Sequence, residues 1–376
     1  MDYKMVKLGT VISQAKNIRC GEHNYPVLSM TMHDGLIFQD DKFKKVIASA
    51  NRSEYKVVYR NQLVVSFPID EGVLAAQRIT DVGIVSPAYT IWDIDQAKIL
   101  PEFLEYALRC DRSINYYKAK LRGSTARRRS LPTPTLLEHT IPLPAIDAQR
   151  YILEIIHKSR NVLETRKIQL QKLDMLVRAR FVEMFGDENN SKNWNVVNVE
   201  DVADVQVGVV IKPSQYYTDE SEGVRAFRSL NIGAGFIKDI DWVYFTKEGH
   251  LKNSKSILKE NDLLIVRSGA PGTACVVTEE YAGCNAVDII IAHPDCEKVN
   301  PYYLCTFTNM PHGKKQIDEG IGGAAQQHFN VGKYNKLQLM LPPKTLQDEF
   351  GDFINQVDKS KLQYHPHTHT CQPNTS

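Results

Sequence analysis

The chain has 376 residues, 43% hydrophobic and 24% charged, and this length predicts two domains of ordinary size. A formal net charge of +2 excludes overall charge as an argument for nucleic-acid binding, so such binding must come from local basic patches. No apolar run approaches the roughly eighteen residues that span a membrane, and the start MDYKMVKLGT does not resemble a signal peptide. Seven cysteines without regular spacing favour reduced thiols, as in a cytoplasmic protein.

An internal repeat is the most informative pattern in the sequence. When the chain is shifted by 200 positions against itself, every glycine between residues 29 and 128 falls on another glycine. The pairs are Gly35 with Gly235, Gly72 with Gly272, Gly83 with Gly283, and Gly123 with Gly323. Chance alone would produce this roughly once in ten thousand registers. Because glycine is tied to special backbone angles, shared glycines predict shared turns, and the chain is predicted to contain two copies of one module.

Both copies are predicted to have the same order of elements. Apolar segments at 57–67 and 256–268 favour strands, and helices at 101–110 and 301–310 each open with proline. Polar stretches follow at 122–130 and 320–329, and the strands HTIPLP and LQLMLPP then end the copies. The predicted fold class is α+β, with two repeated α/β domains at 1–146 and 188–344.

A long helix is predicted between the two copies, at 147–187, because residues 147–185 contain neither glycine nor proline. Its apolar residues recur every seven positions, which predicts a coiled coil. A shorter distal helix at 345–363 offers a matching face, and a disordered tail is predicted at 364–376. The predicted seam consists of Ile156, Leu163, Leu170, Leu173, Val177, Phe350, Ile354 and Val357.

The length of the first helix predicts a spacer. At ~1.5 Å per residue, about 38 residues span on the order of 57 Å. Two modules joined by antiparallel helices would be related by a pseudo-twofold axis, as are the two strands of duplex DNA, so they would suit two half-sites at a fixed separation. A helix that lies across its own domain is the alternative.

The order of these segments resembles the specificity subunit of type I restriction–modification enzymes. The resemblance rests on IPLPAIDAQRYILEII followed by IQLQKLDMLVRARFVEMFGD, on ENDLLIVRSG, and on GIGGAAQQHFNVGKYNKLQLMLPP, and it extends to about Gln363. It implies two target-recognition domains that each bind one half of a split DNA sequence, and helices that dock two methylation subunits and, in the full complex, restriction subunits. It also implies no catalysis and no cofactor in this chain, since S-adenosylmethionine, ATP and Mg belong to the partner subunits. The second helix is shorter than is usual in the family.

No catalytic or metal site is predicted. The sequence has no phosphate-binding G-x-x-x-x-G-K-[ST] loop. Cys275, Cys284, Cys296 and Cys305 lie nine, twelve and nine residues apart, whereas zinc ligands usually come in pairs two to four residues apart. The residues HPHTHTC near the end are attributed to the tail rather than to a metal site.

A basic cluster is the main candidate for DNA contact, with a solvated charged face as the alternative. It consists of Lys118, Lys120, Arg122, Arg127, Arg128 and Arg129. Arginine can bind guanine edges and phosphates. The second copy has Gln326, Gln327 and His328 at the matching place, and because glutamine pairs with adenine, the two copies are predicted to recognise different half-sites. Secondary candidates are Lys212, Arg225, Arg228, Arg267 and Ser268.

The predicted function is DNA-sequence recognition for adenine-N6 methylation and restriction by partner subunits. Two alternatives remain open at this point. One is a scaffold or inhibitor that binds the methylation subunits without productive DNA recognition, which the short second helix favours. The other is a single-chain methyltransferase or nuclease, which the missing cofactor and nuclease motifs disfavour.

Overall fold

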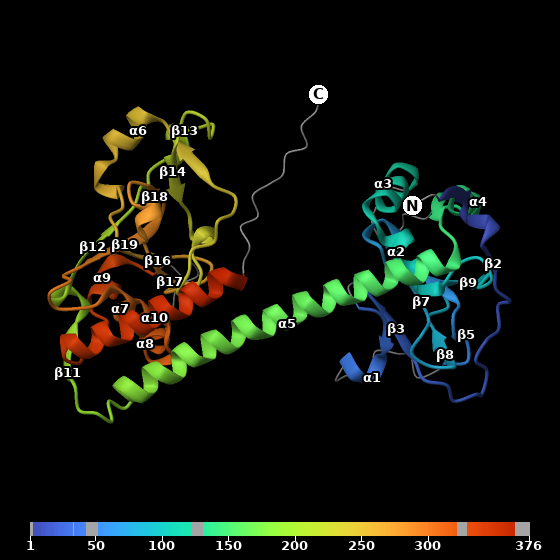
Figure 1. Cartoon of the computed structure of the whole chain (residues 1–376), viewed down its shortest axis with the longest axis horizontal. Helices are drawn as coiled ribbons and strands as arrows, with labels where there is room; N and C mark the ends of the chain where they lie inside the picture. The colour runs from blue at the N-terminus through green and yellow to red at the C-terminus, as the bar shows by residue number, and fades with distance from the viewer. Residues whose placement is uncertain (1–2, 33, 43–51, 122–130, 322–328, 365–376) are drawn as a thin grey trace. The chain divides into compact units, whose positions relative to one another are not determined.

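The computed structural model describes residues 3–32, 34–42, 52–121, 131–321 and 329–364 (Figure 1). Contacts within the chain divide it into two compact units, Met1–Leu163 and Glu164–Ser376. The boundary falls inside α5 (Ile146–Phe185), a continuous helix of 40 residues. In the described ranges, no helix is both long enough and apolar enough to cross a membrane.

Unit 1 is built around an antiparallel sheet in the order β2-β9-β6-β7. Its strands are β1 (Lys4–Lys7), β2 (Ile12–Gln14), β3 (Leu28–Thr31), β4 (Gly35–Phe38), β5 (Lys56–Tyr59), β6 (Leu63–Val65), β7 (Leu74–Ala76), β8 (Val82–Val85), β9 (Thr90–Ile94) and β10 (Thr140–Leu143). Its helices are α1 (Gln39–Lys42), α2 (Pro101–Arg109), α3 (Asp111–Lys120), α4 (Thr133–Glu138) and the first part of α5. Further pairs are β1-β10, β3-β4 and β5-β8.

Unit 2 is built around a sheet in the order β12-β19-β16-β17. Its strands are β11 (Asn195–Asn198), β12 (Ala203–Val207), β13 (Tyr217–Thr218), β14 (Val224–Phe227), β15 (Val243–Phe245), β16 (Leu263–Val266), β17 (Ala274–Val276), β18 (Asn285–Ala286), β19 (Ile289–Pro294) and β20 (Gln338–Leu341). Its helices are α6 (Lys247–Lys252), α7 (Pro301–Asn309), α8 (Pro311–Ile321), α9 (Val331–Asn335), α10 (Lys344–Tyr364) and the second part of α5. A second sheet has the order β13-β15-β14-β18, and β11 pairs with β20.

The two units share one framework, which confirms the predicted repeat. The four-stranded sheets β2-β9-β6-β7 and β12-β19-β16-β17 have the same strand order, and the terminal pairs β1-β10 and β11-β20 correspond. Apolar side chains of each framework sheet pack against the following helix, as Leu63 and Trp92 do with Leu104 in unit 1. Burial of these strand faces supplies most of the stabilisation of each unit.

A buried glutamine ties the framework together at the same place in both units. The Gln149 side chain, 0% exposed, accepts a hydrogen bond from the Leu100 amide at 2.8 Å and donates to the carbonyls of Lys98 and Pro144, both at 2.9 Å. The Gln347 side chain, also 0% exposed, accepts from the Asn300 amide at 2.9 Å and donates to the carbonyls of Lys298 at 3.4 Å and Pro342 at 2.8 Å. The glutamine in each IPLP-x-x-x-x-Q or LPP-x-x-x-Q segment therefore joins three chain segments.

Two of the three described glycine pairs keep the same backbone angles. Gly72 and Gly272 both have left-handed φ angles, of 75° and 72°, and so do Gly35 and Gly235. The third pair differs: Gly83 lies in β8 opposite Val58, whereas Gly283 has a φ of 88° in a turn. The expectation of a shared turn is therefore wrong for this pair: Gly83 lies within the ladder β5-β8, whereas the matching segments of unit 2 meet at the single bridge Ile257–Asn285. Gly123 and Gly323 lie outside the described residues.

The units differ in the segment that connects the first two framework strands. Between β2 and β6, unit 1 has the hairpin β3-β4 and strand β5, which pairs with β8. Between β12 and β16, unit 2 has β13, β14, β15 and α6. We call these segments, residues 15–62 of unit 1 and 208–262 of unit 2, the variable inserts. A duplicated framework with unlike inserts is the pattern expected of two related domains with different ligands.

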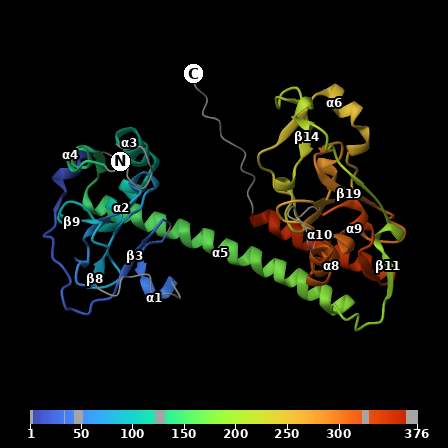
Figure 2. The same cartoon turned by 180° about the vertical axis from the view of Figure 1, so that it is seen from behind.

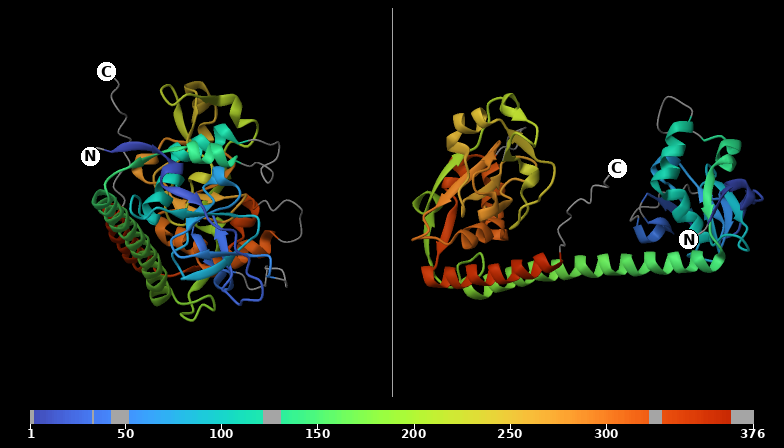
Figure 3. Two further views of the ribbon diagram at one scale, coloured as in Figure 1. Left: turned by 90° about the vertical axis from the view of Figure 1, so that its right-hand side faces the viewer. Right: turned by 45° about the horizontal axis from the view of Figure 1, so that its top comes forward.

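Within unit 2, α10 packs antiparallel on the C-terminal part of α5, and every view shows the two helices side by side (Figures 1, 2 and 3). Arg180 pairs with Glu349 at 2.8 Å, and Asp174 pairs with Lys361 at 2.9 Å. Residue numbers therefore increase along α10 in the direction in which they decrease along α5. The rings of Phe181 and Phe350, next to Arg180 and Glu349 in the sequence, lie 5.5 Å apart. The antiparallel pair of helices is therefore confirmed.

The predicted seam is covered over only part of its length. Phe350, Ile354 and Val357 are buried and Val177 packs against their cluster. Ile156, Leu170 and Leu173 are half-buried, and Leu163 is 69% exposed. The reason is length, because α10 has 21 residues against the 40 of α5.

Candidate nucleic-acid interface

Arg225 lies on β14, in the variable insert of unit 2. It stands opposite Tyr244 of β15, and its guanidinium carbon lies 5.6 Å from the centre of the Trp242 ring. Burial acts to lower the pKa of Arg225, but the neighbouring Tyr244 and Asp239 raise that pKa above its ordinary value overall. Trp242 in turn packs edge-on against Phe227, with ring centres 4.8 Å apart. The arginine is a fixed, half-buried cation supported by aromatic rings.

Arg228 follows β14 and pairs with Asp241. Its Nη2 lies 3.2 Å from the Asp241 carboxylate and donates to the Asp241 backbone carbonyl. Its Nε is buried and has no hydrogen-bond partner in the described part of the chain. The guanidinium therefore has a carboxylate partner at Nη2 and, among the described residues, a buried Nε donor without a partner.

Arg267 sits at the end of β16 and is 18% exposed. Its Nη1 pairs with the Asp288 carboxylate, and its Nε donates to the Phe329 carbonyl at 3.3 Å. The Phe329 amide donates back to the Arg267 carbonyl at 3.1 Å. In this structure Arg267 ties three segments of unit 2 together, and its charge is already matched by a carboxylate.

Lys212 occupies the loop after β12 and is exposed, with a left-handed φ of 44°. The preceding Val209 accepts a hydrogen bond from the Asp288 amide at 3.1 Å, so the loop lies against the residue that pairs with Arg267. Ile211, next to Lys212, is 80% exposed. Lysine and isoleucine here form a protruding tip rather than part of the core.

Residues 286–288 bring four of the predicted positions together. Ala286 pairs with Phe227, next to Arg228, and Asp288 contacts both Arg267 and the loop of Lys212. Lys212, Arg228, Arg267 and Ser268 therefore converge from segments distant in sequence. This convergence arises because β18 and the residues after it lie beside β14 and β12.

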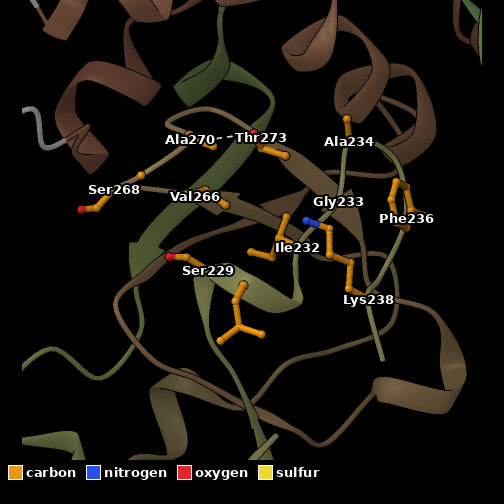
Figure 4. Close-up of a pocket in the computed structure, with 12 residues that line it drawn as sticks. Ser229, Ile232, Gly233, Ala234, Phe236, Lys238, Val266, Ser268, Ala270 and Thr273 are labelled. Atoms are coloured by element: carbon orange, nitrogen blue, oxygen red, sulfur yellow. Dashed lines mark hydrogen bonds between the residues drawn. The ribbon is translucent and has the colours of Figure 1, made fainter. Parts of the chain in front are cut away.

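A pocket of about 450 Å³ adjoins this junction (Figure 4). Ile232 and Val266 form an apolar floor, and Phe236 and Lys238 line one side. The remaining lining residues are Ser229, Leu230, Gly233, Ala234, Ser268, Gly269, Ala270 and Thr273. Of these residues only Ser268 was predicted from the sequence. The GAG stretch at 233–235 was interpreted as a turn, and Phe236 and Lys238, which follow it, had no sequence signal of their own.

In unit 1, Lys118 and Lys120 lie exposed at the end of α3. The helix is anchored by Tyr117, which is fully buried and donates to the Leu108 carbonyl at 3.2 Å. Among the described residues, neither lysine has an acidic partner, and the same holds for Lys212. Three of the predicted cations are therefore available for phosphate contact.

The remaining predicted residues lie outside the described residues. They are Arg122, Arg127, Arg128 and Arg129 after α3, and Gln326, Gln327 and His328 after α8. The last described residue before the first group is Leu121, and the first after the second group is Phe329, which Arg267 holds.

No group of three or more metal-binding side chains occurs in the described ranges. Cys275 and Cys305 are buried, and burial raises the pKa of the Cys305 thiol to about 12 and that of Cys275 well above its usual value. Thiols of this kind stay protonated at neutral pH and are poor nucleophiles and ligands. They behave as core residues.

Comparison with known proteins gives a consistent match. Residues 191–367 match the family described as the type I restriction modification DNA specificity domain. A curated relative, the MjaVIII type I restriction enzyme specificity subunit of Methanocaldococcus jannaschii, is 27% identical over 241 residues, which cover 58% of this chain and 55% of the relative. The match thus spans about half of that relative's length.

Two solved structures share the fold. One is the S subunit of a type I restriction–modification system from M. genitalium, with a TM-score of 0.55, 15% identity, and coverage of 96% of this chain and 91% of that one. The other comes from work on complex assembly and conformational transition of the type I R-M system, with a TM-score of 0.52, 15% identity, and coverage of 96% and 90%. At this identity the likeness is one of fold.

Proposed function

We propose that this chain is the DNA-recognition subunit of a type I restriction–modification complex, a proposal supported by the family model that matches residues 191–367 and by the curated specificity subunit. In this proposal each unit binds one half of a split duplex sequence. Two methylation subunits, which carry adenine-N6 methyltransferase activity, dock on the chain, and restriction subunits join the full complex. The chain itself performs no catalysis, and S-adenosylmethionine, ATP and Mg are bound by its partners.

The observation that carries this proposal is the contrast between framework and insert. The two units keep the same four-stranded sheet and the same buried glutamine, yet the described parts of their inserts at 15–62 and 208–262 differ in strands β13 and β15 and helix α6, which belong to unit 2. Two copies of one enzyme domain would be expected to keep one site, whereas two halves of a split sequence require two different surfaces. Different inserts on one framework supply that difference.

Helix α5 supports the spacer role. At ~1.5 Å per residue, a helix of this length is on the order of 60 Å long, which is slightly less than two turns of DNA at about 34 Å each. It is continuous from Ile146 to Phe185, and its end is fixed by Phe181 and Phe185 packed against Phe350. A helix anchored in this way suits the separation of two half-sites.

We propose that Lys118, Lys120 and Lys212 contact phosphates, because they are exposed cations without acidic partners among the described residues. Arg225, Arg228 and Ser268 are proposed to contribute to the same surface in unit 2. We propose a structural role for Arg267, because it pairs with Asp288 and donates to the Phe329 carbonyl. The predicted groups at 122–129 and 326–328 complete the proposal.

Binding of duplex DNA at several salt concentrations tests this function. Each phosphate contact adds about 0.9 to the slope of log affinity against log salt. Replacement of Lys118, Lys120 and Lys212 together by glutamine is therefore expected to lower the slope by about 2.7. A matched control replaces Lys98 and Lys298, exposed lysines paired with Asp95 and Asp295 at 2.7 and 3.2 Å, and leaves the slope unchanged.

The short helix α10 supports a second candidate function, that of a scaffold that binds methylation subunits without recognising DNA. It is favoured by the exposure of Leu163, at 69%, where α10 does not reach. The same assay separates the two. Salt-independent binding that the triple lysine variant does not change would overturn DNA recognition and favour the scaffold. Loss of one split adenine-methylation motif from the host genome on deletion of the gene would establish recognition.

A further inference from the structure

The pocket beside residues 286–288 has a rigid frame. On one side the Gly233 amide donates to the Phe236 carbonyl at 2.8 Å, and the Gly235 amide donates to the Ala274 carbonyl at 2.8 Å. On the other, the Gly272 amide donates to the Val266 carbonyl at 2.9 Å and the Thr273 hydroxyl to the Ala270 carbonyl at 2.9 Å. Both walls are thus tied to the framework strands β16 and β17, and the pocket is preformed.

One wall presents an aromatic face. Phe236 is 50% exposed although its ring packs on Gly233, where a Cβ atom would lie 2.5 Å from the ring. Only glycine at 233 leaves room for the ring in this position. An aromatic side chain supported from behind and open in front is suited to stack on a planar group.

Polar groups in the pocket are few and partly unused. The Lys238 side chain extends toward Ile232 in the floor, and Ser229 lies on the opposite side of Ile232 (Figure 4). Within the described ranges, neither the Lys238 ammonium nor the Ser229 hydroxyl has a hydrogen-bond or ion-pair partner. An aromatic face, an apolar floor, one cation and one free hydroxyl match a nucleobase with an adjoining phosphate.

A concave pocket is poorly suited to contact the edge of a base that stays stacked in the double helix. Base edges in the major groove lie about 8.5 Å below the phosphates, and proteins reach them with protruding side chains. A pocket instead receives a group that projects from the duplex, which is either a phosphate or an unstacked base. A phosphate site would need several cations or amides, whereas Lys238 is the single cation among the residues that line this pocket.

We propose that this pocket receives one nucleobase unstacked from the half-site that unit 2 binds, an inference that rests on the proposed DNA-recognition function. Phe236 stacks on the base, Ser229 bonds its edge, and Lys238 neutralises the adjoining phosphate. Specificity at that position then comes from the pocket, while Lys212 holds the duplex through its backbone. The covalent structure of the DNA does not change.

The test uses the full-length chain without other subunits, so that an unstacked base is attributable to this chain. Duplexes of the mapped target carry 2-aminopurine at one position of the half-site at a time. Binding is expected to raise the fluorescence several-fold at one position only, and a mismatch at that position is expected to tighten binding about tenfold, because the pairing energy no longer opposes unstacking.

Two variants remove the pocket in different ways. Phe236→Ala deletes the stacking face, and Ala270→Leu fills the pocket without altering charge. Both are expected to abolish the fluorescence rise and the tenfold mismatch effect while keeping the salt slope. Matched controls are Phe67→Ala, where the side chain is 46% exposed in unit 1, and Ala282→Leu, an exposed alanine outside the pocket. Thermal unfolding verifies that each variant is folded.

The possible results are distinct. A salt-dependent, sequence-specific complex in which no position brightens, or in which Ala270→Leu behaves as wild type, overturns the pocket proposal and leaves DNA recognition intact. Absence of any salt-dependent complex overturns the proposed function itself. A separate assay measures assembly of each variant with methylation subunits. If both variants assemble more weakly while their DNA response is unchanged, the pocket binds a protein segment, and the proposal is overturned.

Discussion

Replacement of Gln347 by alanine is the sharpest test of how the repeated framework is stabilised. The side chain is 0% exposed, makes two hydrogen bonds of 2.8 and 2.9 Å, and makes a longer one of 3.4 Å. Each good bond contributes about 1 kcal/mol, and a buried amide left without an acceptor costs about 1–3 kcal/mol. We therefore expect Gln347→Ala to lower the free energy of unfolding of unit 2 by about 3 kcal/mol.

Urea denaturation followed by tryptophan fluorescence measures this loss. The chain has three tryptophans, and in a Trp92→Phe background the two that remain, Trp194 and Trp242, both belong to unit 2. A loss of about 3 kcal/mol lowers the melting temperature of a domain of this size by about 6–12 °C. The control is Gln356→Ala, at an exposed position of the same helix, which is expected to change stability by less than about 0.5 kcal/mol.

Gln347→Glu adds a second check. It keeps the shape of the side chain but replaces the donating NH₂ with an oxygen that faces the Pro342 carbonyl. The variant is expected to be destabilised at pH 7 and partly restored near pH 4, where the carboxyl is protonated and can donate. If Gln347→Ala unfolds within about 0.5 kcal/mol of the wild type, the glutamine does not hold the segments together and the reasoning is wrong.

Two further predictions concern unit 1 and the helix pair. Burial lowers the pKa of His139 from 6.5 to about 4, aided by the charge of Arg112, so the unfolded chain binds the proton at higher pH than the folded one. Stability of unit 1 is expected to be complete above pH 6.5 and to fall by about 3 kcal/mol as the pH drops to 4. His139→Leu should flatten this pH dependence of the unfolding free energy, and an unchanged dependence would contradict the assignment. Phe350→Ala, which removes a fully buried ring 5.4 Å from Phe185, is expected to cost about 3–5 kcal/mol in the same urea assay, and a loss below about 1 kcal/mol would show that the α5–α10 contact is not tightly packed.

The two units have different residues at the position of His139. The Leu8 amide donates to the His139 carbonyl, and in unit 2 the Val199 amide donates to the Leu337 carbonyl, so Leu337 occupies the matching place. His139 lies 2.8 Å from the Ser113 hydroxyl, whereas the position matching Ser113 in unit 2 is Gly313. A polar pair in one unit thus replaces an apolar residue and a glycine in the other. The variant His139→Leu copies what unit 2 already has.

Local patterns in the sequence were sufficient for the repeat and for the long helices. A helix depends on residues three to seven positions apart, so the absence of glycine and proline at 147–185 and the apolar spacing located the ends of α5 to within two residues. Gly72 and Gly272 share left-handed angles, because a tight turn imposes that requirement on its own residue. The pair Gly83 and Gly283 fails because Gly83 lies within the ladder β5-β8, whereas the matching segments of unit 2 meet at the single bridge Ile257–Asn285 and Gly283 falls in a turn.

Tertiary contacts determine which of the predicted cations are paired with carboxylates. Arg228 pairs with Asp241 and Arg267 with Asp288, partners 13 and 21 residues away, so their charges are matched although the sequence presents them as isolated cations. The pocket at Ile232 and Val266 arises only because the turn at 233–236 is bonded to β17. Periodicity reports neighbours along the chain, whereas charge pairing and cavities depend on which strands meet in space, and that is settled by the whole framework. The sequence alone therefore determined the duplicated architecture and its helices, and the tertiary structure alone determined which side chains remain available to bind a partner.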